Sequence, residues 1–130
     1  MFKTLLVDDN LNYRSTFKQA LLKRFVELET MEASDDGEAL RVVDSYGPYL
    51  VIIDIDLKCD LTGLDLTKII KAEHPETVVV ILSQHDIPEY RAVAQDNGAD
   101  NFFSKSTSLE SIFDYVASVI EYTLRDRARA

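Results

Sequence analysis

Short apolar runs alternate five times with stretches of helical periodicity, and this alternation constrains the fold more than any other feature of the sequence. The run at 77–82, TVVVIL, is continuous and β-branched, as is typical of a parallel strand covered on both faces. Alternating strand and helix units joined by right-handed crossovers predict an α/β fold with a parallel sheet between two layers of helices. The five expected strands lie at about residues 3–7, 28–33, 49–54, 77–82 and 100–104.

Amphipathic rows and capping residues predict a helix after each strand. Between about residues 11 and 26, large apolar side chains recur every fourth residue, at Tyr13, Phe17, Leu21 and Phe25. Three N-cap patterns precede later helices: Asp35 with Glu38, Thr62 with Asp65, and Thr107 with Glu110. The buried row expected of the last helix is Leu109, Ile112, Phe113, Val116, Val119 and Ile120.

The fourth helix, expected at about 88–97, differs from the others because it has few apolar residues. Pro88 suits its first turn, and Gly98 suits the position just after its end. A helix with little apolar surface to bury is weakly anchored, so we expect this segment to be a moving part.

Composition narrows the classes of protein that the chain can belong to. Its 130 residues suit one domain, and a formal net charge of −9 disfavours direct binding to nucleic acid. No apolar run approaches the ~20 residues of a membrane span, and the N-terminus does not resemble a signal peptide. The single cysteine, Cys59, excludes an intrachain disulfide and a Cys/His zinc site. We therefore expect a cytoplasmic protein.

Polar residues stand at the ends of four of the five expected strands. Asp8 and Asp9 follow the first, Asp54 ends the third, Ser83 follows the fourth, and Lys105 follows the fifth. Ligands of open parallel sheets bind beyond the carboxyl ends of the strands, so these side chains are expected to meet. Asp54 alone could equally be a strand-end acid that caps the next turn. Because Asp8, Asp9, Ser83 and Lys105 are expected beside it, a functional site is the favoured interpretation.

The chemistry of this group points to a metal ion and a phosphoryl group. Three neighbouring carboxylates cannot all stay ionised without a cation, and oxygen ligands suit Mg²⁺, or Mn²⁺. A carboxylate beside such a metal can act as a nucleophile that forms an aspartyl-phosphate. Transfer of a phosphoryl group also requires a cation such as Lys105 and a hydroxyl donor such as Ser83.

With these residues in this order, the sequence resembles the receiver domain of two-component response regulators over about residues 2–122. The resemblance implies a flavodoxin-like (βα)5 fold, a three-layer sandwich with strand order 2-1-3-4-5. Any one of its markers is weak, but all of them occur in the family's order. They are Asp8-Asp9, Asp54 after VII, Gly63, Ser83 after VVVIL, NGADNFF at 97–103, and Lys105.

The resemblance assigns a role to each marker. Asp54 would accept a phosphoryl group from the phosphohistidine of a sensor histidine kinase or phosphotransfer protein. Asp9 would bind Mg²⁺ directly, Asp8 largely through water, and Asp56 through its backbone carbonyl. Ser83 and Phe102 would be switch residues. Lys105 would pair with Asp54 or with its phosphate.

The resemblance also implies an output. The face formed by about residues 87–122 would change on phosphorylation, control an output such as transcription, and support a homodimer. The domain would be a signalling module rather than an enzyme, although it would assist its own phosphorylation and dephosphorylation. Residues 123–130 would be the end of the last helix or the start of a linker to an output domain.

Three positions depart from the family pattern. Lys58 stands where the family usually has proline, and Gly63 lies one residue later than usual after Asp54. Ser106 replaces the proline that often follows the lysine with a cis peptide bond, which is costly before a non-proline residue. The acidic cluster is unaffected by these changes.

Two other functions remain open. The motif Asp54-x-Asp56 also occurs in small Mg²⁺-dependent phosphatases of the haloacid-dehalogenase type, where the second aspartate is the general acid/base. A degenerate receiver that binds a partner without phosphorylation is the other alternative. In the receiver interpretation, Asp56 lies at the rim and forms a pair with His85 that flanks the path of attacking water.

The remaining residues of note have simpler interpretations. His74 is expected to be a surface residue at a helix end, and Cys59 a loop thiol. Tyr115 and Tyr122 fall outside the buried row of the last helix, so they indicate either a partner surface or partial burial.

Overall fold

The computed structural model of the protein describes residues 2–128, which form one parallel sheet with helices on both faces. The strand order is β2-β1-β3-β4-β5, which confirms the flavodoxin-like arrangement. The elements are β1 (Phe2–Val7), α1 (Leu11–Arg24), β2 (Leu28–Ala33), α2 (Asp36–Tyr46), β3 (Leu50–Asp54), α3 (Gly63–Glu73), β4 (Val78–Ser83), α4 (Pro88–Asp96), β5 (Asn101–Ser104) and α5 (Leu109–Ala128).

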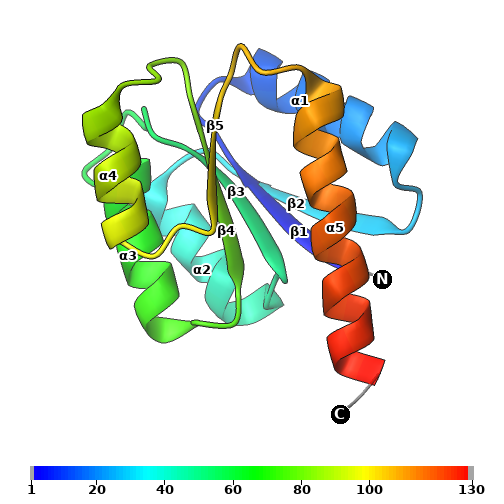
Figure 1. Ribbon diagram of the computed structural model, residues 1–130. Coiled ribbons are helices and arrows are strands. Elements are labelled where there is room, and N and C mark those ends of the chain that lie inside the picture. The colour runs from blue at the N-terminus through cyan, green and yellow to red at the C-terminus, as the bar shows by residue number, and fades with distance from the viewer. Residues whose placement is uncertain (1, 129–130) are drawn as a thin grey trace.

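Figure 1 shows three layers, with α1 and α5 on one side of the sheet and α2, α3 and α4 on the other. One apolar core joins α1 and α5 to the sheet, through residues such as Phe17, Leu21 and Phe113. On the other face, α2 and α3 bury Val43, Leu66 and their neighbours. Because both faces are covered, the strand β3 is buried along its whole length, including Asp54.

Two of the three predicted N-caps are confirmed. Asp35 accepts a hydrogen bond from the Glu38 amide (2.8 Å), although the Glu38 carboxylate accepts the amide of Ser34 (2.8 Å) rather than that of Asp35. Thr62 and Asp65 form a reciprocal capping box at the start of α3. These side chains satisfy amide groups that the first turn of a helix leaves unpaired.

The prediction for the last helix was wrong in two details. Thr107 and Glu110 do not form the cap, because α5 begins at Leu109 and Thr107 belongs to the preceding turn, where its amide donates to the Ser104 carbonyl oxygen. Ser108 caps α5 instead, and its hydroxyl accepts the Ser111 amide (3.2 Å). Leu109, expected in the buried row, is 37% exposed because it begins the first turn, beyond the edge of the core, whereas the rest of the row is buried.

The tail at 123–128 is helical and continues α5. Tyr115 is partly buried against Phe103, with ring centroids 5.7 Å apart, whereas Tyr122 is 71% exposed. Between residues 2 and 128, no helix combines the length and the apolar character that crossing a membrane requires.

The helix α4 is weakly anchored, as its composition predicted. Ala94 is its only buried residue, and Val93 is 42% exposed. Ile87 at the N-cap offers no side-chain hydrogen bond, and Gly98 follows the helix with a φ of 93° that favours glycine. Few apolar contacts therefore hold this helix against the sheet.

Gly63 allows α3 to begin directly against the end of β3. A Cβ atom at this position would lie 2.2 Å from the carbonyl oxygen of Asp54 and 2.8 Å from the Cα atom of Ile55. Both are backbone atoms that cannot rotate away. The extra residue before Gly63 is accommodated in the loop, where the Leu61 amide donates to Asp36 (3.2 Å).

We predict that Gly63→Ala lowers the free energy of unfolding by about 2–3 kcal/mol, the cost of overpacking against rigid neighbours. Gly37→Ala is the matched control, because its Cβ would meet only side-chain atoms at 3.6 and 3.7 Å. Urea denaturation measures both. Equal effects of the two substitutions would contradict the close packing of α3 on β3.

Candidate functional site

The carboxyl ends of the strands bring the predicted polar residues to one edge of the sheet. Carboxylate oxygens of Asp8, Asp9 and Asp54 lie within 4.8 Å of one another. Asp54 ends β3, and Asp8 follows β1, its parallel neighbour. Lys105 reaches the same place because its amide donates to the carbonyl oxygen of Ser83 (2.7 Å), which extends the pairing of β4 with β5.

Lys105 supplies the positive charge of the site. Its ammonium group lies 2.9 Å from Asp8 Oδ2 and 3.5 Å from Asp54 Oδ2. All three side chains are at most 8% exposed, so water screens these charges poorly. One ammonium group faces three carboxylates here, which leaves the cluster with an excess of negative charge.

Backbone contacts fix the two acids that follow β1. The Asn10 amide donates to Asp8 Oδ1 (2.9 Å), and the guanidinium group of Arg14 donates to the Asp8 carbonyl oxygen. The Lys58 amide donates to Asp9 Oδ2 (3.3 Å). The orientation of both carboxylates is therefore set by the loops around the strand ends.

Asp54 carries the main electrostatic cost of the site. Burial, followed by the charge of Asp8, raises the pKa of Asp54 from 3.8 to about 6, and Lys105 opposes this shift. Its Oδ1 atom is buried and has no hydrogen-bond partner among the described residues. A buried carboxylate oxygen without a partner is unfavourable, so a cation or donor would stabilise it.

An open cleft of about 280 Å³ adjoins these side chains. Four of its seven lining residues, Asp9, Asp54, Asp56 and Lys105, were predicted as site residues from the sequence. The other three, Asn10, Lys58 and Gln84, were not. Two of these positions in the sequence could have indicated this, because Asn10 directly follows the acidic pair and Gln84 directly follows the strand-end serine.

Ser83 lies at the end of β4, as predicted, but its hydroxyl group does not contact Asp54. It donates to the carbonyl oxygen of His85 (3.0 Å) and accepts the amide of the same residue (3.0 Å). The imidazole Nε2 of His85 lies 4.0 Å from Asp56 Oδ2, and both side chains are about half exposed. Asp56 is therefore a rim residue whose carboxylate faces His85.

Phe102 is buried under α4 rather than exposed. It packs with Ile55, Ile81 and Ala94, and the guanidinium group of Arg91 lies 4.6 Å from its ring centroid. The sequence did not predict this contact.

No peptide bond in residues 2–128 is cis, so Lys105 and Ser106 are joined in trans.

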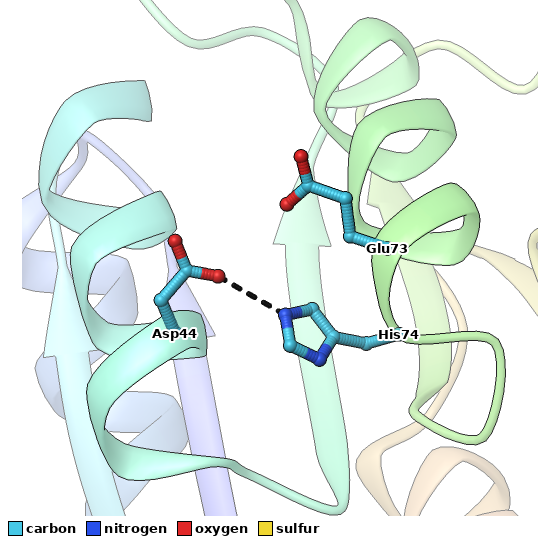
Figure 2. A group of neighbouring side chains, drawn as sticks. All are labelled: Asp44, Glu73 and His74. Atoms are coloured by element: carbon cyan, nitrogen blue, oxygen red, sulfur yellow. Dashed lines mark hydrogen bonds and ion pairs between the residues drawn. The ribbon is translucent and has the colours of Figure 1, made fainter.

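A second group of metal-ligand side chains, Asp44, Glu73 and His74, lies at the carboxyl ends of α2 and α3 (Figure 2). Helices run antiparallel to the strands in this fold, so the group is at the edge of the sheet opposite Asp54. His74 Nε2 and Asp44 Oδ1 are 3.0 Å apart, and the Asp44 side chain is 62% exposed. The pair is a solvent-exposed link between two helices, as the surface assignment of His74 suggested.

Comparison with known proteins agrees with the geometry. The response regulator receiver domain family matches residues 4–117. NreC from Staphylococcus haemolyticus, an oxygen regulatory protein, is 30% identical over 90% of this chain and 54% of its own length. The transcriptional activator protein ExaE from Pseudomonas putida is 32% identical over 89% of this chain and 54% of its own.

Solved structures show the same architecture. The receiver domain of NtrX from Brucella abortus has a TM-score of 0.81 at 32% identity, covering 91% of this chain and 98% of that one. A CheY-like receiver from Methanospirillum hungatei superposes with a TM-score of 0.87 at 21% identity, covering 97% and 98%. The chain spans about half the length of the curated relatives it matches. Its sequence, strand order and strand-end residues together show that it belongs to the response regulator receiver domains.

Proposed function

We propose that the chain is a phosphorylatable receiver in which Asp54 accepts a phosphoryl group from a sensor histidine kinase or phosphotransfer protein. The observation that carries this proposal is the buried carboxylate of Asp54, with one unpartnered oxygen beside Asp8, Asp9 and Lys105. The expected location is the cytoplasm. The names of the relatives, which are transcriptional and oxygen regulators, support transcription as the output.

The residues at this edge fit a Mg²⁺ or Mn²⁺ ion. Asp9 and Asp54 offer carboxylate oxygens, Asp8 lies within 4.8 Å of both, and the cleft leaves room for the waters that Mg²⁺ retains. The backbone carbonyl of Asp56 would add a neutral ligand. When bound, the ion would offset the excess negative charge and neutralise charge on an incoming phosphoryl group.

The chemistry of this chain's residues is nucleophilic. A carboxylate oxygen of Asp54 attacks phosphorus, an O–P bond forms, and the N–P bond of the phosphohistidine breaks with its electron pair on the imidazole nitrogen. Lys105 faces the carboxylate and stabilises charge on the phosphoryl oxygens. Water attack on phosphorus later breaks the O–P bond and restores the Asp54 carboxylate.

The switch would begin at Ser83. Its hydroxyl group is held by His85 and would turn toward the phosphoryl oxygens once Asp54 is modified. That turn frees the loop before α4, the helix with the fewest buried residues, and alters the packing over Phe102. The α4–β5–α5 face is thus the proposed output and homodimer surface, and its response is a shift between two populations.

The phosphatase alternative requires Asp56 as a second catalytic acid. Asp56 points to His85 instead, and its side chain is 48% exposed. The geometry therefore favours the receiver function over hydrolysis of phosphate esters.

We predict that Asp54→Asn stabilises the metal-free protein at pH 7 by about 1–2 kcal/mol, because it removes a buried charge. The pKa of Asp54 is raised from 3.8 to about 6 in the folded protein, so the stability cost of this carboxyl grows from about pH 4 to pH 6 and is complete above pH 6. Below about pH 4 the side chain is protonated in both the folded and unfolded states, so the advantage of asparagine disappears.

Urea denaturation between pH 3.5 and 7.5 measures this difference. Saturating Mg²⁺ should stabilise the wild type more than the Asp54→Asn variant. Asp60→Asn, at an exposed acid of the same loop, is the control and should change neither property. A pH-independent gain from Asp54→Asn would contradict the electrostatic explanation.

We predict that acetyl phosphate with Mg²⁺ adds one phosphoryl group to the protein, and that Asp54→Asn abolishes this adduct. Lys105→Ala should slow its formation by roughly 100-fold, as loss of one preorganised donor does elsewhere. Intact-protein mass spectrometry and peptide mapping measure both. Absence of an adduct at Asp54, or steady release of phosphate from many phosphate esters, would favour the alternatives.

The Asp56–His85 pair should control the lifetime of the phosphoryl group, because the two side chains flank the open side of the cleft. We predict that Asp56→Ala and His85→Ala each shorten the half-life by at least ~3-fold, or about 0.6 kcal/mol in the barrier. His74→Ala, at the opposite edge of the sheet, is the control. Unchanged half-lives in both variants would remove this role for the pair.

A further inference from the structure

Tyr13 contacts the charged cluster but has no role in the chemistry described above. It lies in the first turn of α1, with its ring half-buried. The ammonium nitrogen of Lys105 lies 4.1 Å from the centroid of this ring. A lysine over the face of a tyrosine at this distance is attracted by the ring quadrupole. Tyr13 is therefore a direct partner of the residue that neutralises Asp54.

Two hydrogen bonds fix the backbone of Tyr13 relative to the acids. The side chain of Asn10, the N-cap of α1, accepts the Tyr13 amide (3.0 Å). The amide of Asn10 in turn donates to Asp8 (2.9 Å). The Tyr13 ring also stacks on Phe17, with centroids 6.1 Å apart and an interplanar angle of 25°. The loop that orients Asp8 thus anchors the start of α1, and Phe17 limits the movement of the ring.

The ring completes the surroundings of the ammonium group. Lys105 has two anionic partners, Asp8 and Asp54, and Tyr13 covers a third direction. A lysine side chain has several rotatable bonds, and two carboxylates at 2.9 and 3.5 Å still leave it free to move toward the closer one. A rigid aromatic face limits that movement.

The phenol remains neutral in this environment. Burial, followed by the charges of Asp8 and Asp54, raises the pKa of Tyr13 to about 12. The ring therefore interacts with Lys105 through its face and adds no further negative charge to the cluster.

We propose that Tyr13 is a positioning residue that holds the Lys105 ammonium group between Asp8 and Asp54 for phosphoryl transfer. This role rests on the proposed function of Asp54. Charges that are already in place need no reorganisation when the reaction occurs. As negative charge develops on the phosphoryl oxygens, the Lys105 ammonium group moves from Asp8 to these oxygens. It keeps its contact with the face of the Tyr13 ring throughout.

A simpler role for Tyr13 is to fill space. It also lines a small, mostly apolar cavity next to Asp54, together with residues such as Leu6, Ile52 and Leu82. A filler can be replaced by any side chain of similar volume, whereas a cation–π partner requires an aromatic face. Phenylalanine and leucine therefore distinguish the two roles.

The experiment compares Tyr13→Phe and Tyr13→Leu in the rate of Asp54 phosphorylation by acetyl phosphate at saturating Mg²⁺. Tyr13→Phe should match the wild type. Tyr13→Leu should be slower by about 5- to 30-fold, the factor expected for a desolvated cation–π contact. Tyr13→Met, which also fills irregular space without an aromatic face, replaces the leucine variant if that variant does not fold.

A double-mutant cycle tests whether Tyr13 acts through Lys105. In a Lys105→Ala background, Tyr13→Leu should cause no further loss of rate. Equal rates for Tyr13→Leu and wild type, or additive losses in the double variant, would overturn the proposal.

An NMR measurement separates this proposal from the proposed function. The ε-methylene protons of Lys105 should be shifted upfield by the ring in the wild type and in Tyr13→Phe, and should lose the shift in Tyr13→Leu. Lys105→Ala assigns the signal. Failure of Asp54 to form an adduct while the shift is present would refute phosphorylation but not the contact. A normal adduct without the shift would refute the contact alone.

Discussion

The desolvated charge of Asp54 is the constraint around which the other site contacts are arranged. β3 lies in the middle of the sheet between two layers of helices, so its last residue is buried together with its apolar ones. A carboxylate there is unfavourable unless positive charge compensates it. Lys105 compensates only in part, because Asp8 shares the same ammonium group. The proposed affinity of the site for a cation and the proposed reactivity of Asp54 both follow from this incomplete compensation.

Properties set by chain order and periodicity could be predicted from the sequence. The five strands follow from their apolar runs, and parallel pairing then places Asp8, Asp54 and Lys105 at one edge without further information. Local errors occurred where two capping residues compete. Thr107 and Ser108 are adjacent hydroxyl residues, and only the turn at Ser104 decides that the second one caps α5.

Contacts between side chains of distant elements could not be predicted in this way. The ring of Tyr13 under Lys105 joins residues that are far apart in the sequence, and it depends on rotamers of both. The same holds for Arg91 over Phe102 and for the hydroxyl of Ser83, which bonds to the loop instead of facing Asp54. Periodicity gives the face on which a residue lies but not the direction of its terminal atoms.

These unpredicted contacts form a connected path from the site to the proposed output surface. Ser83 holds the loop at His85, and the next residue, Asp86, is paired with Arg91 on α4. Arg91 also covers the ring of Phe102 and donates to its carbonyl oxygen (3.4 Å). The helix α4 has one buried residue, Ala94, so Arg91 adds a polar contact to a helix with little apolar anchoring. In the proposed switch, a change in the direction of the Ser83 hydroxyl group would reach α4 through this loop, because little apolar packing opposes movement of the helix.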